Sequence, residues 1–446
     1  MVAIMPIKIE DMRNTKAFPD TSYRFSRLLQ NSKQTILERD YLGENPLHYY
    51  LDVKTRELIV ANNICDIKKT VESHKNNFVY ERVRAVSNNT RATFSQNSGS
   101  EFETISPKEE EILPILQQDQ LSVVGINCKD LATTGRQLRL LLQKSVEQRL
   151  STIPDEKIGL LLSGGLDSMS VGYILSRIPG RNFMAFTLKV DENESDIVRS
   201  RQIAKDFGLE LAEVKLSKNG CKIRISMQKY SPRRKLIDEQ EINSNLSMEN
   251  IVFQTLLVSG NPKQDNAFCA IAMNLIGEAI QSEGIKTVFC GEGPNEMIND
   301  YGFDPVKFGY GTSDKGNILF RQALTFGFKK EDRQNGRGGL SKHALFRMGK
   351  IFADYDIRLE SPYFDRSIAN IMTRIPHIGG YGQIKQLIMQ NVFVGEALEK
   401  FIQGVAKEKF QDGSGVSKLF KDYTQQRLLE IFKDIYGVMK TGYLGQ

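Results

Sequence analysis

The sequence contains few of the residues on which disulfide and metal frameworks depend. It has no Trp, only four His and only five Cys among 446 residues. No two Cys form a C-x-x-C pair and no two His have the spacing of a ligand pair, so we expect neither disulfide nor zinc frameworks. Free thiols indicate a reducing, cytoplasmic setting. The five cysteines are Cys65, Cys128, Cys221, Cys269 and Cys290.

Long apolar runs are also missing. None reaches the ~18 residues that a membrane span needs, and the N-terminal residues MVAIMPIKIEDMRN are too short and acidic for a signal peptide. The net charge of +6 is modest. Basic residues concentrate between 222 and 235 without interleaved aromatics, which we interpret as a solvated loop near a nucleotide site. We therefore expect small-molecule partners, and neither membrane nor nucleic acid.

The length allows two domains, each with its own core. Residues 1–130 contain short apolar segments between charged turns, which predict an antiparallel sheet. Residues 87–106 are polar, and we expect them to be weakly structured. An amphipathic helix over 131–150 then leads into the second domain, so the predicted domains are 1–130 and 131–446.

From residue 157 onward, strand-like and helical patterns alternate. This alternation predicts an α/β fold with a doubly wound parallel sheet, followed by a mostly helical C-terminal part. Residues 302–342 are rich in Gly and charge and are interpreted as a mobile loop. The expected strands are 158–162, 182–190, 209–216 and 287–293. A helical pattern with Met169, Val171, Ile174 and Leu175 follows the first strand, and further helices are expected at 195–208 and 267–284.

The most informative stretch is S-G-G-L-D-S at residues 163–168, between a buried strand and a helix. A helix that starts after a glycine turn directs backbone N–H groups and the positive end of its dipole at an anion. Asp167 would repel a bare phosphate, which suggests a bridging Mg²⁺. Ligands of doubly wound sheets bind at the C-terminal ends of strands. The predicted phosphate-binding residues are therefore Ser163, Gly164, Gly165, Asp167, Ser168, Thr187 and Gly291.

No Lys follows these glycines, so the loop is not a GxxxxGK[ST] phosphate loop. It resembles instead the pyrophosphate loop of the N-type ATP pyrophosphatases, among them asparagine synthetase and β-lactam synthetase. The resemblance implies that ATP and Mg²⁺ are cofactors, and that a substrate carboxylate is adenylated before a nitrogen nucleophile displaces AMP.

A second segment, GEGPNEMINDY at 291–301, resembles the GEGADELFGGY segment of asparagine synthetases. The resemblance implies that Glu292 lies at the catalytic centre. The family's second Mg²⁺-holding Asp is Asn295 here, whose amide oxygen can ligate Mg²⁺ without charge. Two family glycines are replaced by Asn299 and Asp300.

Three further segments resemble the family toward the C-terminus. In 347–365, Arg358 and Glu360 stand where the family has Glu and Arg, and they form either an ion pair with exchanged signs or two unrelated surface charges. GGYGQIKQLIMQ (379–390) and AKEKFQDGSG (406–415) resemble the family's lysine-bearing segments. The resemblance implies that Lys407 stabilises the charge of amide formation and that Lys385 contacts phosphate.

Residues 38–63 resemble part of the family's glutaminase domain, but Val2 occupies the position of its nucleophilic Cys. The resemblance therefore implies a degenerate, Ntn-hydrolase-like domain that does not hydrolyse glutamine, kept for packing and suggesting a homodimer interface. We expect an amide-forming ligase that joins a small-molecule or peptide carboxylate to an amine, in specialised metabolite or antibiotic biosynthesis. The alternatives are ammonia-dependent asparagine synthesis and non-catalytic nucleotide binding.

Overall fold

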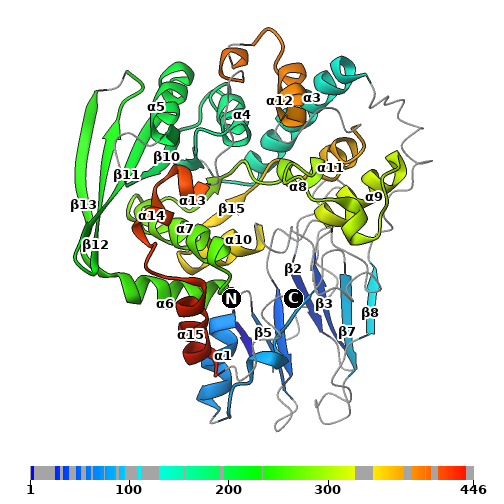
Figure 1. The fold of residues 1–446 in the computed structure, drawn as a ribbon, viewed down its shortest axis with the longest axis vertical. Coiled ribbons are helices and arrows are strands. Elements are labelled where there is room, and N and C mark those ends of the chain that lie inside the picture. Colours follow the sequence, from blue (N-terminus) through cyan, green and yellow to red (C-terminus); the bar gives the residue numbers. More distant parts are fainter. Residues whose placement is uncertain are drawn as a thin grey trace.

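The structure is a computed structural model of the chain, shown in Figure 1. It describes residues 2–4, 26–30, 34–39, 47–51, 57–61, 64–74, 76–86, 90–95, 108–111, 130–154, 156–190, 195–233, 235–326, 345–375, 383–396, 398–402 and 410–437. Within these ranges, no helix is both long and apolar enough to cross a membrane.

The largest element is a seven-stranded sheet in the order β13-β12-β11-β10-β9-β14-β15. The strands from β11 to β15 in this order run parallel, as predicted. All seven residues of β10 are buried because helices cover both faces of the sheet. The strands are β9 (Ile158–Leu161), β10 (Phe183–Lys189), β11 (Glu210–Asn219), β12 (Lys222–Tyr230), β13 (Leu236–Ser247), β14 (Thr287–Phe289) and β15 (Arg358–Glu360).

The expected helices are present, and the expected α/β architecture is confirmed. The helices are α1 (Ile64–Ser73), η2 (Tyr80–Arg82), α3 (Leu131–Leu150), α4 (Leu166–Leu175), α5 (Ser195–Phe207), α6 (Met248–Ser259), α7 (Gln264–Ser282), α8 (Pro294–Ile298), η3 (Pro305–Phe308), α9 (Asp314–Phe326), α10 (Leu345–Asp354), α11 (Arg366–Met372), α12 (Gln383–Val392), η6 (Glu399–Phe401), α13 (Phe410–Gly413), α14 (Val416–Leu419) and α15 (Gln425–Tyr436).

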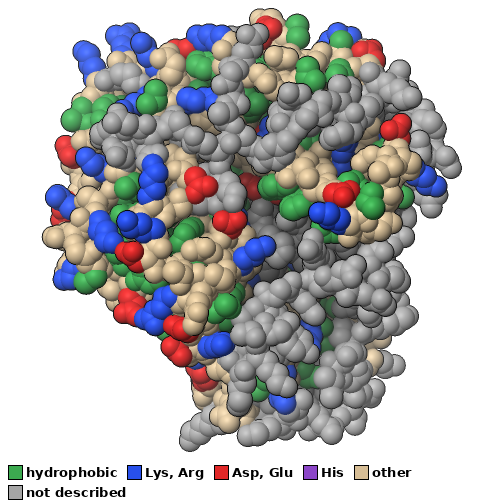
Figure 2. Space-filling model, viewed as in Figure 1, with side chains coloured by type: hydrophobic (Ala, Val, Ile, Leu, Met, Phe, Trp, Pro, Cys, Tyr) green, Lys and Arg blue, Asp and Glu red, His purple; other side chains and the backbone are tan. Residues whose placement is uncertain are grey.

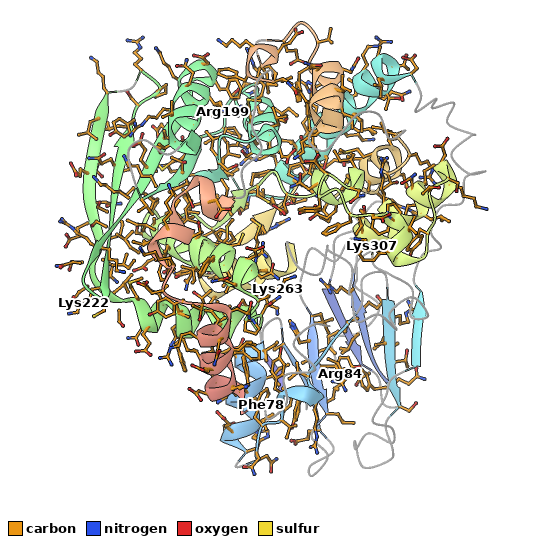
Figure 3. The ribbon with its side chains drawn as sticks, viewed as in Figure 1. Phe78, Arg84, Arg199, Lys222, Lys263 and Lys307 are labelled. Atoms are coloured by element: carbon orange, nitrogen blue, oxygen red, sulfur yellow. The ribbon has the colours of Figure 1, made fainter. Side chains whose placement is uncertain are left out.

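The basic stretch at 222–235 is not the expected loop. Most of it lies in the antiparallel β12–β13 hairpin at the edge of the sheet. Its strand alternates buried Ile223, Ile225 and Met227 with outward polar residues. Acidic partners on β13 balance the charges, as in the 2.5 Å ion pair from Lys229 to Asp238. Figure 2 shows Lys and Arg mixed with Asp and Glu on this side, and Figure 3 shows Lys222 at the hairpin.

Two other expectations are also corrected. The predicted loop at 302–342 contains the helix α9, whose buried Phe320 packs with Phe303, Phe308 and Tyr310; residues 327–344 lie outside the described residues. The weakly structured stretch at 87–106 contains β7 (Thr90–Ser95), which pairs with β3.

The described residues of the N-terminal unit form two antiparallel four-stranded sheets, where one was expected. Strands alternate their side chains, so Tyr49 packs into the core between the two sheets while Tyr50 packs toward α1. One sheet has the order β1 (Val2–Ile4), β5 (Leu58–Ala61), β4 (His48–Leu51) and β6 (Arg84–Ala85), and the other β2 (Ser26–Gln30), β3 (Gln34–Arg39), β7 and β8 (Lys108–Glu111).

An aromatic cluster connects this unit to the rest of the chain. The Tyr80 ring lies 4.7 Å from that of Tyr436 and 5.3 Å from that of Phe432, both on α15. The Tyr80 hydroxyl also donates to the carbonyl of Gly260 at 3.1 Å. Phe78, labelled in Figure 3, extends the cluster. The C-terminal helix therefore packs on the N-terminal unit, and the domain boundary at 130 stays a prediction.

Candidate functional site

The S-G-G-L-D-S loop lies at the C-terminal end of β9 and leads directly into α4, as predicted. The Ser168 hydroxyl bonds across the loop, accepting from the Ser163 backbone N–H at 3.2 Å and donating to the Gly165 carbonyl at 3.1 Å. Gly164 has φ 74°, a backbone region that favours glycine. Gly165, the N-cap of α4, makes no side-chain hydrogen bond to the helix, and an α-helix N-terminus of this kind favours an anion.

Gly291 brings the second motif against this loop. A Cβ built on Gly291 would lie 2.3 Å from the Ser168 backbone nitrogen and 2.4 Å from the Asp167 carbonyl carbon. Only glycine allows the chain after β14 to pass this close to the start of α4. Glu292 and Asn295 are consequently fixed on the same side of the sheet as the loop.

Lys385 of α12 lies at the junction of the two motifs. Its Nζ is 2.7 Å from Asp167 Oδ2, donates to Asn295 Oδ1, and is 3.6 Å from Asp300 Oδ2. The Lys385 side chain is 9% exposed, and that of Asp300 only 1%. Burial alone would lower the pKa of Lys385, but the charges of Asp167 and Asp300 raise it, so the ammonium form is stabilised.

A pair of acidic residues lies next to this cluster. Burial and the nearby charge of Glu292 raise the pKa of Glu296 to about 8. The Tyr301 hydroxyl donates to Glu296 Oε1 at 2.7 Å, and burial raises the pKa of Tyr301 as well. A carboxyl group whose pKa lies near neutrality is suited to proton transfer during amide formation.

Arg347 of α10 lies close enough to Cys269 and Tyr301 for its charge to act on both. Its guanidinium donates to Asn266 Oδ1 at 2.7 Å and to Cys269 Sγ at 3.1 Å. The charges of Arg347 and Glu292 both act on the half-buried Cys269, whose pKa is raised by desolvation. A cationic group therefore lies near the acidic pair.

A buried arginine supports the backbone next to Glu292. Arg149 of α3 donates to the carbonyls of Ser361, at 2.6 Å, and Phe364, and the Ser361 hydroxyl donates to the carbonyl of Glu292 at 2.6 Å. Glu360 lies between two cations, 2.5 Å from Arg358 Nε and 3.7 Å from Arg149 Nε. The ion pair with exchanged signs is therefore present, with Arg149 as a partner that the sequence did not suggest.

The structure brings most of the predicted residues together, with two exceptions. Thr187 is buried, and its hydroxyl donates to Ser200 Oγ at 3.4 Å. Lys407 lies outside the described residues. The sequence reading assigned no role to Asp300, Arg347 or Arg149, although Asp300 was noticed as a departure from the family pattern.

The donor chemistry of Asp167, Asn295 and Asp300 suits Mg²⁺, which prefers oxygen ligands. In the described residues these oxygens surround the Lys385 ammonium, and no cluster of three or more His, Cys, Asp or Glu is arranged for a metal. A metal that uses these oxygens would have to replace Lys385.

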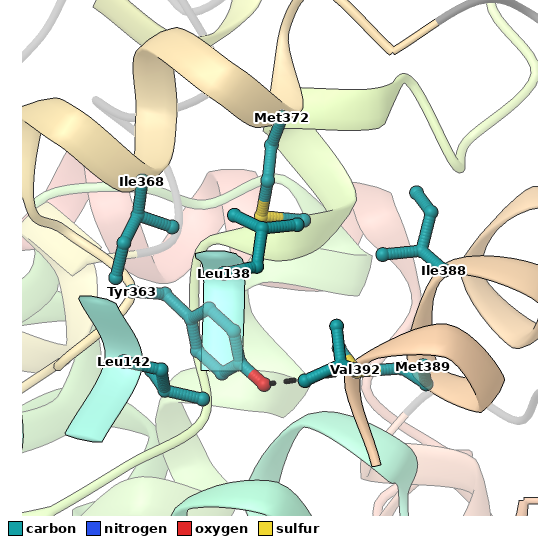
Figure 4. Close-up of a pocket in the computed structure, with 8 residues that line it drawn as sticks. All are labelled: Leu138, Leu142, Tyr363, Ile368, Met372, Ile388, Met389 and Val392. Carbon is teal, nitrogen blue, oxygen red and sulfur yellow. Dashed lines mark hydrogen bonds between the residues drawn. The ribbon is translucent and has the colours of Figure 1, made fainter. Parts of the chain in front are cut away.

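Behind the site, α3, α11 and α12 enclose a small apolar hollow (Figure 4). The Tyr363 hydroxyl points at Met389 Sδ, 4.0 Å away. Met389 is one helical turn beyond Lys385, so packing around the hollow helps to set the position of Lys385. The lining residues are Leu138, Leu142, Tyr363, Ile368, Met372, Ile388, Met389 and Val392.

Comparisons with known proteins point in the same direction. Residues 137–224 match the family model of asparagine synthase. Asparagine synthetase [glutamine-hydrolyzing] of Gallus gallus is 25% identical over 312 residues, and those of Mus musculus and Homo sapiens are 24% identical over 313 residues. Each alignment covers 67% of this chain and 48% of the relative, so the chain spans about half the length of these relatives. These distant similarities support a relationship to the asparagine synthase family.

Proposed function

We propose that this chain is an ATP-dependent, AMP-forming carbon–nitrogen ligase. The observation that carries the proposal is the contact between the two motifs, in which Gly291 packs on Asp167 and Ser168 and places Glu292 beside the loop. In the proposed reaction, a substrate carboxylate oxygen bonds to the α-phosphorus and the α–β bond breaks, releasing pyrophosphate. An amine nitrogen then bonds to the acyl carbon, loses a proton, and AMP leaves.

The chain's own residues have distinct parts in this proposal. The α4 N-terminus and the hydroxyls of Ser163 and Ser168 bind the phosphates. Asp167 and Asn295 would hold Mg²⁺, which supplies charge neutralisation when it is bound. Glu292, next to the buried Glu296, accepts the amine proton. Lys407 is proposed, on the resemblance alone, to stabilise the developing oxyanion.

We further propose that the amine does not come from glutamine. The cysteine that lies nearest in sequence to the glutaminase-like segment 38–63 is Cys65. Cys65 is buried on α1, and burial raises the pKa of its thiol, which disfavours the reactive thiolate. An amine substrate other than glutamine supports a role in specialised metabolite biosynthesis, as in β-lactam synthetases.

Ammonia-dependent asparagine synthesis is the second candidate. It is favoured by the similarity to asparagine synthetases and by Glu292 in the GEG segment. A cytoplasmic location and a homodimer remain predictions.

The test is nucleotide product analysis. Purified protein is incubated with ATP, Mg²⁺ and pooled amino and organic acids, with and without ammonium. We expect acid-dependent AMP and pyrophosphate, which Asp167→Asn abolishes. The matched control is Asp356→Asn, because the Asp356 side chain is 90% exposed. ADP with phosphate would refute the mechanism, and asparagine formed from aspartate and ammonium would favour the second candidate. ATP binding without acid-dependent pyrophosphate exchange would favour a non-catalytic protein.

A further inference from the structure

Lys385 is surrounded by oxygen atoms from different elements. Asp167 belongs to the first turn of α4, Asn295 to α8, and Asp300 follows α8 in the chain. All three direct a side-chain oxygen at the same ammonium, at 2.7 Å for Asp167 and 3.6 Å for Asp300. A lysine on a third element, α12, therefore occupies the centre of a convergent set of oxygen ligands.

These oxygens are of the kind that a hard divalent cation binds. Two are carboxylates and one is an amide oxygen, which is a suitable donor set for Mg²⁺ or Mn²⁺. The two carboxylates and one ammonium together carry a charge of −1, so the set still attracts cations. Lys385 and a divalent ion cannot both occupy the centre, because like charges at contact distance repel strongly.

We propose that Lys385 is an internal occupant of a cation site formed by Asp167, Asn295 and Asp300. In the nucleotide-free protein its ammonium excludes divalent metal from these oxygens. Asp300 is a binding residue of this site and provides the second carboxylate, since position 295 carries an uncharged amide.

This inference rests on the phosphate site of the proposed function and adds an order of binding to it. The negative charge of a bound phosphate attracts the ammonium, and Lys385 has a flexible four-carbon stem on which to follow it. Its departure leaves two carboxylates and an amide oxygen free for the metal. Binding of phosphate therefore favours binding of the metal at these oxygens, and the metal alone binds weakly.

The test measures Mn²⁺ binding by electron paramagnetic resonance and calorimetry, without nucleotide. Wild-type protein is expected to bind Mn²⁺ only at millimolar concentration. Lys385→Met removes the competitor and is expected to tighten binding at least tenfold, and adding Asp300→Asn to it is expected to reverse most of that gain. Lys307→Met is the matched control, because Lys307, on η3 and labelled in Figure 3, is exposed. It should leave Mn²⁺ binding at the wild-type value.

Lys385→Gln, which keeps hydrogen-bond donors without the charge, provides a second variant in case the methionine variant does not fold. Circular dichroism and thermal unfolding check both. Micromolar Mn²⁺ binding by the wild type without phosphate would overturn the proposal. So would folded Lys385 variants that bind Mn²⁺ no better than the wild type. Because no turnover is measured, failure to form AMP would refute the proposed ligase reaction without affecting this result.

Discussion

Gly135 of α3 packs directly on the backbone of Asn391 of α12. A Cβ at position 135 would lie 2.5 Å from both the carbonyl carbon and the carbonyl oxygen of Asn391. Neither atom belongs to a flexible side chain, so the neighbour cannot move aside without moving the helix. The glycine therefore sets the distance between α3 and the helix that carries Lys385.

Gly135→Ala distinguishes helix propensity from packing. The higher helix propensity of Ala relative to Gly would by itself stabilise the helix by about 1 kcal/mol. The contact with Asn391 should outweigh this and reduce the free energy of unfolding by roughly 1–3 kcal/mol. We expect urea unfolding to show this loss, and ATP affinity to fall because Lys385 shifts with α12.

Leu140→Ala is the matched control for that experiment. Leu140 lies on the same helix but is 68% exposed, so its replacement should change neither stability nor ATP affinity appreciably. A stabilised Gly135→Ala protein with normal ATP affinity would contradict the packing argument.

Gly291→Ala should damage the nucleotide site directly. The added Cβ would overlap the backbone where α4 begins, forcing the loop and the GEG segment apart. We expect at least a tenfold loss of ATP affinity in calorimetry. Gly208→Ala tests whether general destabilisation is enough: with φ 69° and no atom within 4 Å of the added Cβ, it should cost ~1 kcal/mol of stability. Its ATP affinity should stay normal. Equal losses of affinity in both variants would contradict a local effect.

The ion pairs of Glu360 should differ greatly in energy. Glu360 is fully buried, and Arg149 beside it is also buried. Glu360→Gln removes the carboxylate from buried Arg149, which should cost about 3–5 kcal/mol in unfolding free energy. The Arg358 side chain is 48% exposed. Arg358→Ala should therefore lower the free energy of unfolding by only about 0–1 kcal/mol. Similar losses for the two variants in guanidinium unfolding would show that the exposed arginine holds Glu360.

The sheet and the loop were predictable because their signals are local. A parallel strand buried on both faces is a short apolar run, and the S-G-G-L-D-S letters follow one such run directly. The same reasoning missed β12, although Ile223, Ile225 and Met227 alternate at strand spacing. We interpreted this stretch as a loop because it is rich in charge. A half-buried antiparallel strand has polar residues at every second position, so its charge content resembles that of a loop.

The surroundings of Lys385 could not be read from local patterns. Asp167 and Lys385 are 218 residues apart, and they meet where α12 packs against α3 and α8. The sequence identified Asn295 as a weakened metal ligand, but not that Asp300 directs a second carboxylate at the same point. Arg347 and Arg149 were missed for the same reason, since single arginines carry no signal until the fold gives them partners.

Lys350 should make stability depend on pH. It is buried on α10, donates to the Ser259 carbonyl at 2.9 Å, and burial together with the nearby charge of Arg39 lowers its pKa from 10.5 to about 7. Between these two values the unfolded chain binds more protons than the folded one, so the free energy of unfolding should rise with pH, by at most ~1.4 kcal/mol per pH unit. Below pH 7 this contribution becomes constant, with its full penalty present.

Lys350→Met should remove this slope. The measurement is urea unfolding from pH 7 to 9.5. The free energy of unfolding of the variant minus that of the wild type should fall as the pH rises, because the wild type loses the penalty of the buried ammonium. The lost bond to Ser259 shifts the variant's stability equally at every pH, so only the slope reports the buried ammonium. The exposed Lys307, replaced by Met, should keep the wild-type slope. Parallel pH profiles for Lys350→Met and wild type would mean that Lys350 has its ordinary proton affinity in the folded chain.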